Sequence, residues 1–152
     1  MKLFRSLVVL FSVFMLFFAQ VHAATADGVK QAIIKHSIAM GVEPAIMLSI
    51  AKTESGFRQE ARGASGTIGV FQLMPATAKN MGYNPYNLEE NIKAGITYYK
   101  SMYKTFGSME LAIAAYNSGP VAVKRCNGIP KHSQGFVNKI LADYRYFKSQ
   151  KI

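Results

Sequence analysis

Residues 46–69 read IMLSIAKTESGFRQEARGASGTIG, and the architecture of the whole chain can be worked out from them. Met47, Ile50 and Glu54 follow one another at spacings of three and four residues, so they share one face of a helix. Gly56 ends this helix, and three further glycines behind it indicate a loop. The stretch therefore predicts an acid at the end of an apolar helix stripe, beside a glycine-rich loop.

This position gives Glu54 an unusual electrostatic environment. Apolar neighbours would desolvate the carboxylate, and the negative end of the helix dipole lies close to it, so both disfavour the charged form. We therefore expect a raised pKa, which suits a general acid. The alternative from these residues alone is a surface glutamate whose stem lies along the edge of the core.

The amino terminus has the pattern of a secretory signal peptide over residues 1–23. Lys2 and Arg5 precede an apolar run at 7–19, and small residues stand at the cleavage position after Ala23. The run is shorter than the ~20 residues of a spanning helix, which leaves an uncleaved anchor as the alternative. No cysteine stands near the cleavage site, so we expect no lipid anchor. The expected mature domain, 24–152, would be periplasmic or otherwise extracytoplasmic.

The charge and the cysteine content narrow the function classes. Removal of Lys2 and Arg5 would leave 16 basic residues against eight acids, a net charge of about +8. Such a charge suits an acidic partner, for example cell-wall polymer, anionic lipid or extracellular nucleic acid. Cys126 is the single cysteine, so an internal disulfide is excluded. We expect it to be a small buried residue rather than a nucleophile.

The hydrophobic pattern predicts one all-α domain without repeats or linkers. Asp27 is expected to cap the first helix, and Pro44 to open the helix that carries Glu54. Gly119-Pro120 is expected to close the fifth helix, with a loop around 126–130 behind it. The expected helices are 28–40, 44–54, 75–82, 88–106, 109–117 and 133–149.

The sequence lacks the residues that a metal site, a serine nucleophile or a phosphate-binding loop would require. His36, His132 and Cys126 have no ligand-like spacing, so no metal site is expected. No serine stands in a G-x-S-x-G elbow. The glycines at 63, 66 and 69 follow no strand and form no phosphate-binding fingerprint.

A DNA-binding helix-turn-helix over residues 32–54 is the main competing interpretation. Its recognition helix would be 44–53, which offers few side chains that read bases: Ser49, Lys52 and Thr53. Export would also remove the chain from genomic DNA. We therefore expect no nucleic-acid partner.

The carboxylates point to a single catalytic acid. Five of the eight acids stand at expected helix starts, where capping and the helix dipole explain them: Asp27, Glu43, Glu89, Glu90 and Glu110. A two-carboxylate glycosidase needs a second acid ~5–5.5 Å or ~6.5–9.5 Å from the first. Glu60, in the loop, is the local candidate and a poor one, so the pattern favours one acid with polar and aromatic helpers.

Four sequence blocks occur in order: ESGF at 54–57, GTIGVFQLMPATA at 66–78, NIKAG at 91–95 and AIAAYNSGP at 112–120. They are similar to the ES, G-x-x-G-L-M-Q-L-M-P-x-T-A, N-I-x-A-G and A-x-A-A-Y-N-A-G-P blocks of the soluble lytic transglycosylases. With the flanking helices, the match covers nearly all of 32–144. The resemblance implies the goose-type lysozyme fold, a single helical domain with a substrate groove.

The resemblance also implies an activity. Family members cleave the β-1,4 bond between N-acetylmuramic acid and N-acetylglucosamine in peptidoglycan and close a 1,6-anhydro ring instead of adding water. Glu54 would act as acid and then as base, while the substrate's N-acetyl group replaces a second carboxylate. No cofactor is implied, and we expect a monomer. The chain would serve general wall turnover or open the wall for a secretion, conjugation or pilus assembly.

Two alternatives stay open at this point. One is a lysozyme-like hydrolase that uses the same site. The other is a wall-binding component of a secretion or conjugation apparatus that has no catalytic activity.

Three polar residues receive substrate-binding roles from the resemblance. The amides of Gln72 and Asn117 would hold sugar N-acetyl or hydroxyl groups, although they could instead bond loop backbone. The phenol of Tyr116 would hydrogen-bond the Glu54 carboxyl or the substrate.

Three further residues near the acid complete the implied site. Phe71 would form the floor of the sugar site, unless it is a core residue. Gly69 would let the backbone approach the glycan, and Ser55 would support the loop after the helix.

The sequence departs from the family pattern at three places. Gly63 stands where the family has a serine, nine residues after the glutamate, so a polar contact with the substrate is expected to be missing. His132 and Phe136 replace the Glu and Tyr of an E-T-x-x-Y-V motif, which puts the polar support of the cleft in question. Val70-Phe71 replaces the family's Leu-Met.

Overall fold

The computed structural model describes residues 25–150, and the signal peptide expected at 1–23 lies outside them. This part of the chain folds into seven α-helices and one short 3-10 helix, and it contains no β-strand. The elements are α2 Ala26–Ala39, α3 Pro44–Ser55, α4 Pro75–Asn80, α5 Leu88–Phe106, α6 Met109–Ser118, α7 Pro120–Cys126, η1 Lys131–Ser133 and α8 Gln134–Ser149. The predicted all-α fold is confirmed.

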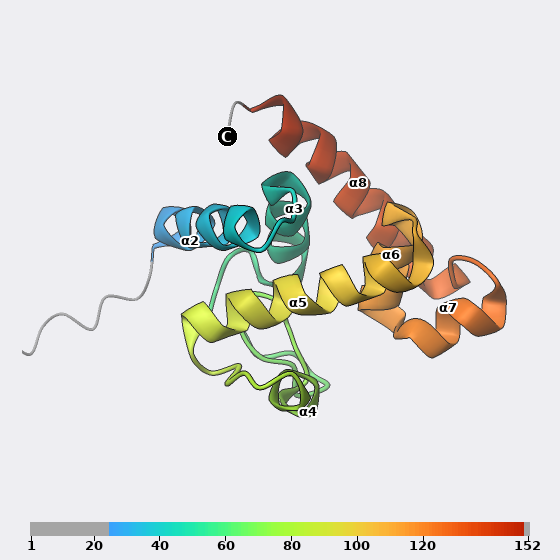
Figure 1. Cartoon of the computed structure of the whole chain (residues 1–152), viewed down its shortest axis with the longest axis horizontal. Helices are drawn as coiled ribbons and strands as arrows, with labels where there is room; N and C mark the ends of the chain where they lie inside the picture. Colours follow the sequence, from blue (N-terminus) through green and yellow to red (C-terminus); the bar gives the residue numbers. More distant parts are fainter. Residues whose placement is uncertain (1–24, 151–152) are drawn as a thin grey trace, which may run out of the picture.

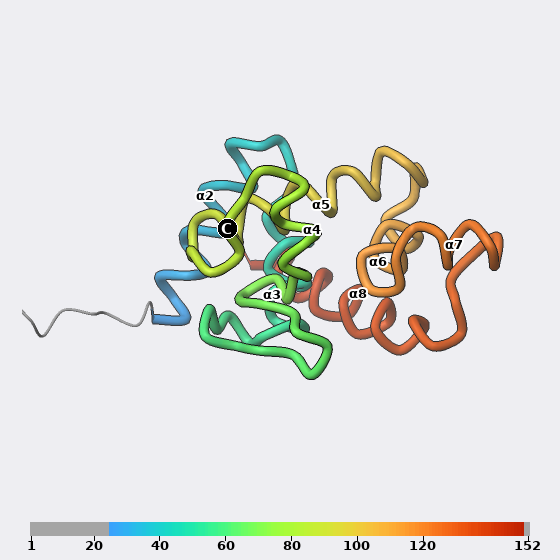
Figure 2. The backbone as a smooth tube through the Cα atoms, turned by 90° about the horizontal axis from the view of Figure 1, so that it is seen from below, coloured from blue at the N-terminus to red at the C-terminus, as the bar shows by residue number. Residues whose placement is uncertain are grey.

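Helix α3 lies between α2 and α8, as Figure 1 shows. Its residues 45–51 are all buried, because α2 and α8 pack against it. Helix α5 packs against α2 and α6, and α6 in turn contacts α7 and α8. Both views place α2 and α7 at opposite ends of the molecule (Figures 1 and 2). The acid at the end of α3 thus stands on a helix whose preceding turns are packed in the core.

The helix ends follow local rules that the sequence displays. Pro44 occupies the first turn of α3, and Gly56 ends it in the left-handed conformation, with φ 62°. Helix α5 begins after Asn87, whose side chain accepts the Glu90 N–H, and it ends at Phe106, before the C-cap Gly107. The predicted span 88–106 for α5 is confirmed.

One predicted detail at a helix end is wrong, and another is incomplete. Thr25, not Asp27, caps α2, because its hydroxyl accepts the Gly28 N–H, while Asp27 is the second residue of the helix and pairs with Lys30. Gly119-Pro120 does close α6, but it also opens α7, which we did not predict. Gly119 has φ 80° and turns the chain, after which Pro120 occupies a favourable first-turn position.

The expectation of a buried Cys126 is also wrong. Cys126 is the last residue of α7 and is exposed. Helix α7 buries one residue fully, Val123, so most of its surface faces outward.

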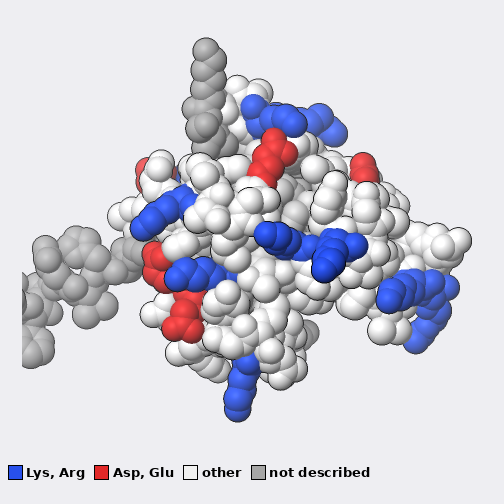
Figure 3. Space-filling view, in the orientation of Figure 1, with Lys and Arg blue, Asp and Glu red and all other residues white. Residues whose placement is uncertain are grey.

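On the face drawn in Figure 3, the Lys and Arg side chains lie in several separate groups. None of the helices within 25–150 combines the length and the apolar character needed to cross a membrane.

Candidate active site

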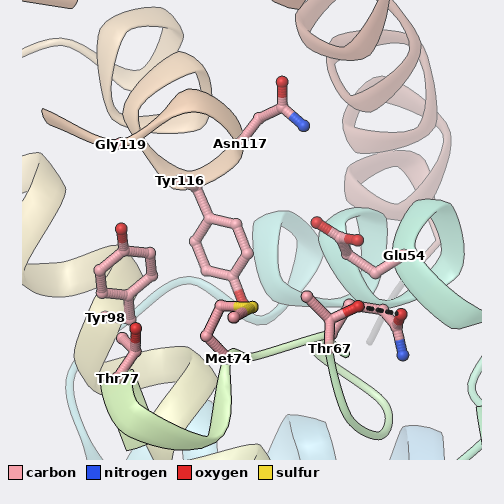
Figure 4. A pocket seen from close by; sticks show the side chains of 9 residues that line it. Glu54, Thr67, Met74, Thr77, Tyr98, Tyr116, Asn117 and Gly119 are labelled. Carbon is pink, nitrogen blue, oxygen red and sulfur yellow. Dashed lines mark hydrogen bonds between the residues drawn. The ribbon is translucent and has the colours of Figure 1, made fainter. Parts of the chain in front are cut away.

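A groove of about 300 Å³ opens beside the end of α3. Its walls come from α3, the loop behind it, α4, α5 and α6, as Figure 4 shows. The residues that line it are Glu54, Thr67, Gln72, Met74, Thr77, Tyr98, Tyr116, Asn117 and Gly119. Five segments that are distant in sequence therefore meet around one acid.

Glu54 projects from the last turn of α3 into the groove, with its carboxylate directed toward Tyr116 (Figure 4). Burial raises the pKa of this carboxyl from 4.5 to about 7. Among the described residues no cation or hydrogen-bond donor offsets the effect. The predicted rise is confirmed, and a large fraction of Glu54 is protonated near neutral pH.

The raised pKa predicts that stability depends on pH. The folded protein holds the Glu54 proton up to about pH 7, whereas the unfolded chain releases it near pH 4.5. The Glu54 contribution to the free energy of unfolding is therefore full below pH 4.5 and falls by about 3 kcal/mol as pH rises to 7. Urea unfolding across this range, on wild type and Glu54→Gln, measures it. An equal pH dependence in both proteins would contradict the assignment.

Ser55 lies outside the groove, where it joins the loop to α3. Its hydroxyl donates to the Val70 carbonyl at 2.8 Å and accepts the Arg58 N–H at 3.1 Å. It supports the loop, and its buried position keeps it from the groove wall.

Phe71 and Gly69 also lie outside the groove. Phe71 is fully buried in the core, so its ring does not form a floor for a sugar. A Cβ on Gly69 would lie 2.6 Å from the Asn91 amide nitrogen. Gly69 therefore leaves room for Asn91 rather than for a ligand.

Gln72 lines the groove, but the loop backbone and Thr67 occupy its amide. The amide nitrogen donates to the carbonyls of Gly69 at 2.9 Å and Ala61 at 3.3 Å. Its oxygen accepts the Thr67 hydroxyl at 2.7 Å, the bond drawn dashed in Figure 4. The backbone-bonding alternative thus describes Gln72 in this structure.

Tyr116 and Asn117 form the opposite wall, from the end of α6. The buried Tyr116 hydroxyl donates to the Phe71 carbonyl at 2.9 Å, and its ring meets that of Tyr98 edge-on. Burial, followed by the nearby Glu54 charge, raises the pKa of this phenol well above its ordinary value, so it stays protonated. Asn117 is exposed, and its amide oxygen accepts the Ser133 hydroxyl at 2.9 Å.

Replacing Tyr116 by phenylalanine should leave the buried Phe71 carbonyl without its donor. An unsatisfied buried group costs ~1–3 kcal/mol, and we expect the free energy of unfolding to fall by that amount. Tyr98→Phe is the matched control, because Tyr98 lines the same groove and its ring meets Tyr116. Equal urea midpoints for the two variants would show that the hydrogen bond from Tyr116 to the Phe71 carbonyl adds nothing to stability.

Sequence reasoning assigned no role to five of the residues that line the groove: Thr67, Met74, Thr77, Tyr98 and Gly119. Thr67, Met74 and Thr77 lie in the second sequence block, 66–78, and Gly119 lies in the fourth, 112–120. Their place in these blocks could have indicated a role at the site. Tyr98 had none, because one tyrosine on a long amphipathic helix resembles a core residue.

The departures from the family pattern have different structural meanings. A Cβ on Gly63 would lie 2.0 Å from the Thr67 hydroxyl oxygen, so a side chain at position 63 would displace that oxygen. His132 is exposed in η1, Phe136 is half-buried, and neither lines the groove. Among residues 25–150, no group of three or more His, Cys, Asp or Glu side chains could hold a metal ion.

Comparison with known proteins finds a matching family model and a similar phage protein. Residues 31–137 match the family model described as Transglycosylase SLT domain. A protein of Enterobacteria phage PRD1 named Transglycosylase is 32% identical over 79 residues, which are 51% of this chain and 30% of the phage protein.

Solved structures share the fold. The 70 kDa soluble lytic transglycosylase of Escherichia coli matches with a TM-score of 0.72 and 25% identity, over 78% of this chain and 24% of its own. An inactive variant of lytic transglycosylase Slt from Pseudomonas aeruginosa gives 0.70 and 23%, over 88% and 25%. This chain therefore spans about a quarter of either protein's length. Because the family model covers more than half of the chain, this protein belongs to the Transglycosylase SLT domain family.

Proposed function

We propose that this protein is an exported lytic transglycosylase that cleaves the β-1,4 bond between N-acetylmuramic acid and N-acetylglucosamine in peptidoglycan. One observation carries the proposal: Glu54 is the sole carboxylate among the described residues that line the groove, and its pKa is raised to about 7. An acid that is protonated near neutral pH can donate a proton and, once ionised, retrieve one.

The proposed reaction uses Glu54 twice. Its carboxyl proton passes to the glycosidic oxygen as the bond to the muramic anomeric carbon breaks. The resulting carboxylate then takes the proton of the muramic 6-hydroxyl, whose oxygen bonds to the same carbon and closes the 1,6-anhydro ring. No water is consumed, and the carboxyl returns to its starting state.

The lining of the groove supports this reaction over a two-carboxylate mechanism. Glycosidases of that kind hold two acids ~5–9.5 Å apart, whereas Glu60, the nearest acid in sequence, is exposed in the loop and absent from the groove wall. The substrate's own N-acetyl group would then stabilise the positive charge on the sugar, as in substrate-assisted enzymes.

Digestion of purified sacculi followed by mass spectrometry of the glycan products tests the proposal. Anhydro-muramic ends, one water lighter than reducing ends, are expected. Reducing ends alone would identify a lysozyme-like hydrolase. Binding of sacculi without any cleavage would identify a wall-binding module, and either result would overturn the proposal.

A further inference from the structure

Gly63, Thr67 and Gln72 form a tightly fitted group at the edge of the groove. The backbone N–H of Gly63 donates to the Thr67 carbonyl at 3.0 Å, which holds the two residues side by side. The Thr67 hydroxyl occupies the space into which a side chain at 63 would project, 2.0 Å from the position of a Cβ. Among the three, Thr67 and Gln72 line the groove.

The hydrogen bonds of Gln72 determine which way its amide faces. Its nitrogen end meets two backbone carbonyls, those of Ala61 and Gly69. Carbonyl oxygens only accept, so the NH₂ group must point toward them. The amide oxygen therefore faces Thr67 and can only accept there.

The direction of the Thr67 hydrogen bond follows. A hydroxyl has one hydrogen, and Thr67 donates it to the Gln72 oxygen at 2.7 Å. Only the lone pairs of the hydroxyl oxygen then remain available to bind a ligand. At this point the groove consequently offers a fixed acceptor, which favours an N–H or O–H donor and repels a carbonyl oxygen.

We infer that Thr67 is a substrate-binding residue whose hydroxyl oxygen accepts a hydrogen bond from an N–H or O–H group of the N-acetylated glycan. The inference rests on the proposed function, because it assumes that a glycan occupies this groove. Gly63 leaves space for the Thr67 hydroxyl, and Gln72 takes its hydrogen, so that the hydroxyl oxygen can only accept from a ligand. A polar contact expected to be missing at position 63 is thus supplied four residues later.

Thr67→Val tests the inference, since valine keeps the branched shape and removes the hydroxyl. Calorimetry with soluble N-acetylated glycan fragments, in a Glu54→Gln background that prevents cleavage, should give a Kd about five- to tenfold higher than with Thr67, the loss of one hydrogen bond. Thr67→Ser keeps the hydroxyl and should stay within about twofold. Thermal unfolding of both variants is measured as well, to show whether the fold is retained.

A second variant addresses the same hydroxyl without removing it. In Gly63→Ala the new Cβ displaces the Thr67 oxygen, so affinity should fall as with Thr67→Val. In a Thr67→Ala background the same change should cost clearly less, because the Thr67 oxygen is gone and the Gln72 amide oxygen, 2.8 Å from the Cβ, is the remaining close contact. Equal losses in both backgrounds would mean that the added Cβ simply strains the loop, and would overturn the inference.

The outcomes separate this inference from the proposed function. If the glycan does not bind with Thr67 in place and wild type cleaves no glycan, the proposed function fails. If it binds and the valine variant binds equally well, Thr67 makes no contact and the inference alone fails. The inference also fails if serine and valine weaken binding equally.

Discussion

Replacing Glu54 by glutamine should lower the rate of glycan cleavage by about a thousandfold, the middle of the range for losing a general acid. Glutamine has nearly the same shape but carries no acidic proton, and its amide cannot act as the base of the second step. The fold should survive, because no hydrogen bond or ion pair from Glu54 to another described residue would be broken. Clearing of a sacculus suspension measures the rate, and circular dichroism checks the fold.

Glu60→Gln is the matched control for this experiment. Glu60 lies in the loop six residues later, is exposed and does not line the groove. We expect the control to clear sacculi as fast as wild type. A Glu54→Gln variant that clears sacculi at the wild-type rate would exclude Glu54 as the acid. A comparable loss in both variants would point to general electrostatics instead of one proton donor.

The predicted helices match the structure where their ends depend on local chemistry. Helix α5 lies between Asn87, which caps it, and Gly107 in the left-handed conformation, and both signals are legible in the sequence. The raised pKa of Glu54 was predictable for a similar reason. An apolar stripe four and seven residues before Glu54, and a glycine stop two residues after it, already indicate an acid that is buried at a helix end.

The parts that could not be predicted depend on contacts between distant segments. Gly119-Pro120 is compatible with the end of one helix and with the start of another, and the second helix becomes evident in the structure, where its Val123 is buried. Within the loop, sequence could not tell which side chains face the groove. Phe71 turns into the core because Asn91 on α5 binds its backbone N–H, and Thr67 remains at the groove.

Asn91 should be among the most sensitive positions for stability. Its buried side chain accepts the Phe71 N–H at 2.9 Å and donates to the carbonyls of Ile68 at 3.0 Å and Pro85 at 3.1 Å. One side chain thus attaches the groove loop and the segment before α5 to the core. Leucine, of similar size, would leave the buried Phe71 N–H without an acceptor. The Ile68 and Pro85 carbonyls would each lose one of two donors, because the Leu73 N–H and the Gln59 amide still bond them. At ~1–3 kcal/mol for the unsatisfied group and ~0.5–1.5 kcal/mol for each lost bond, we expect the free energy of unfolding to fall by at least about 2 kcal/mol.

Urea unfolding of Asn91→Leu against Asn138→Leu makes this measurable. Asn138 is an exposed asparagine on α8 whose side chain bonds Gln134 alone among the described residues, so its loss should cost under about 0.5 kcal/mol. Asn91→Asp refines the test, because aspartate keeps an acceptor for Phe71 but cannot donate to either carbonyl. It should therefore remain clearly less stable than wild type. If the leucine variants of Asn91 and Asn138 unfolded at the same urea concentration, the loop would be held by its apolar contacts, and the three hydrogen bonds would be incidental to the shape of the groove.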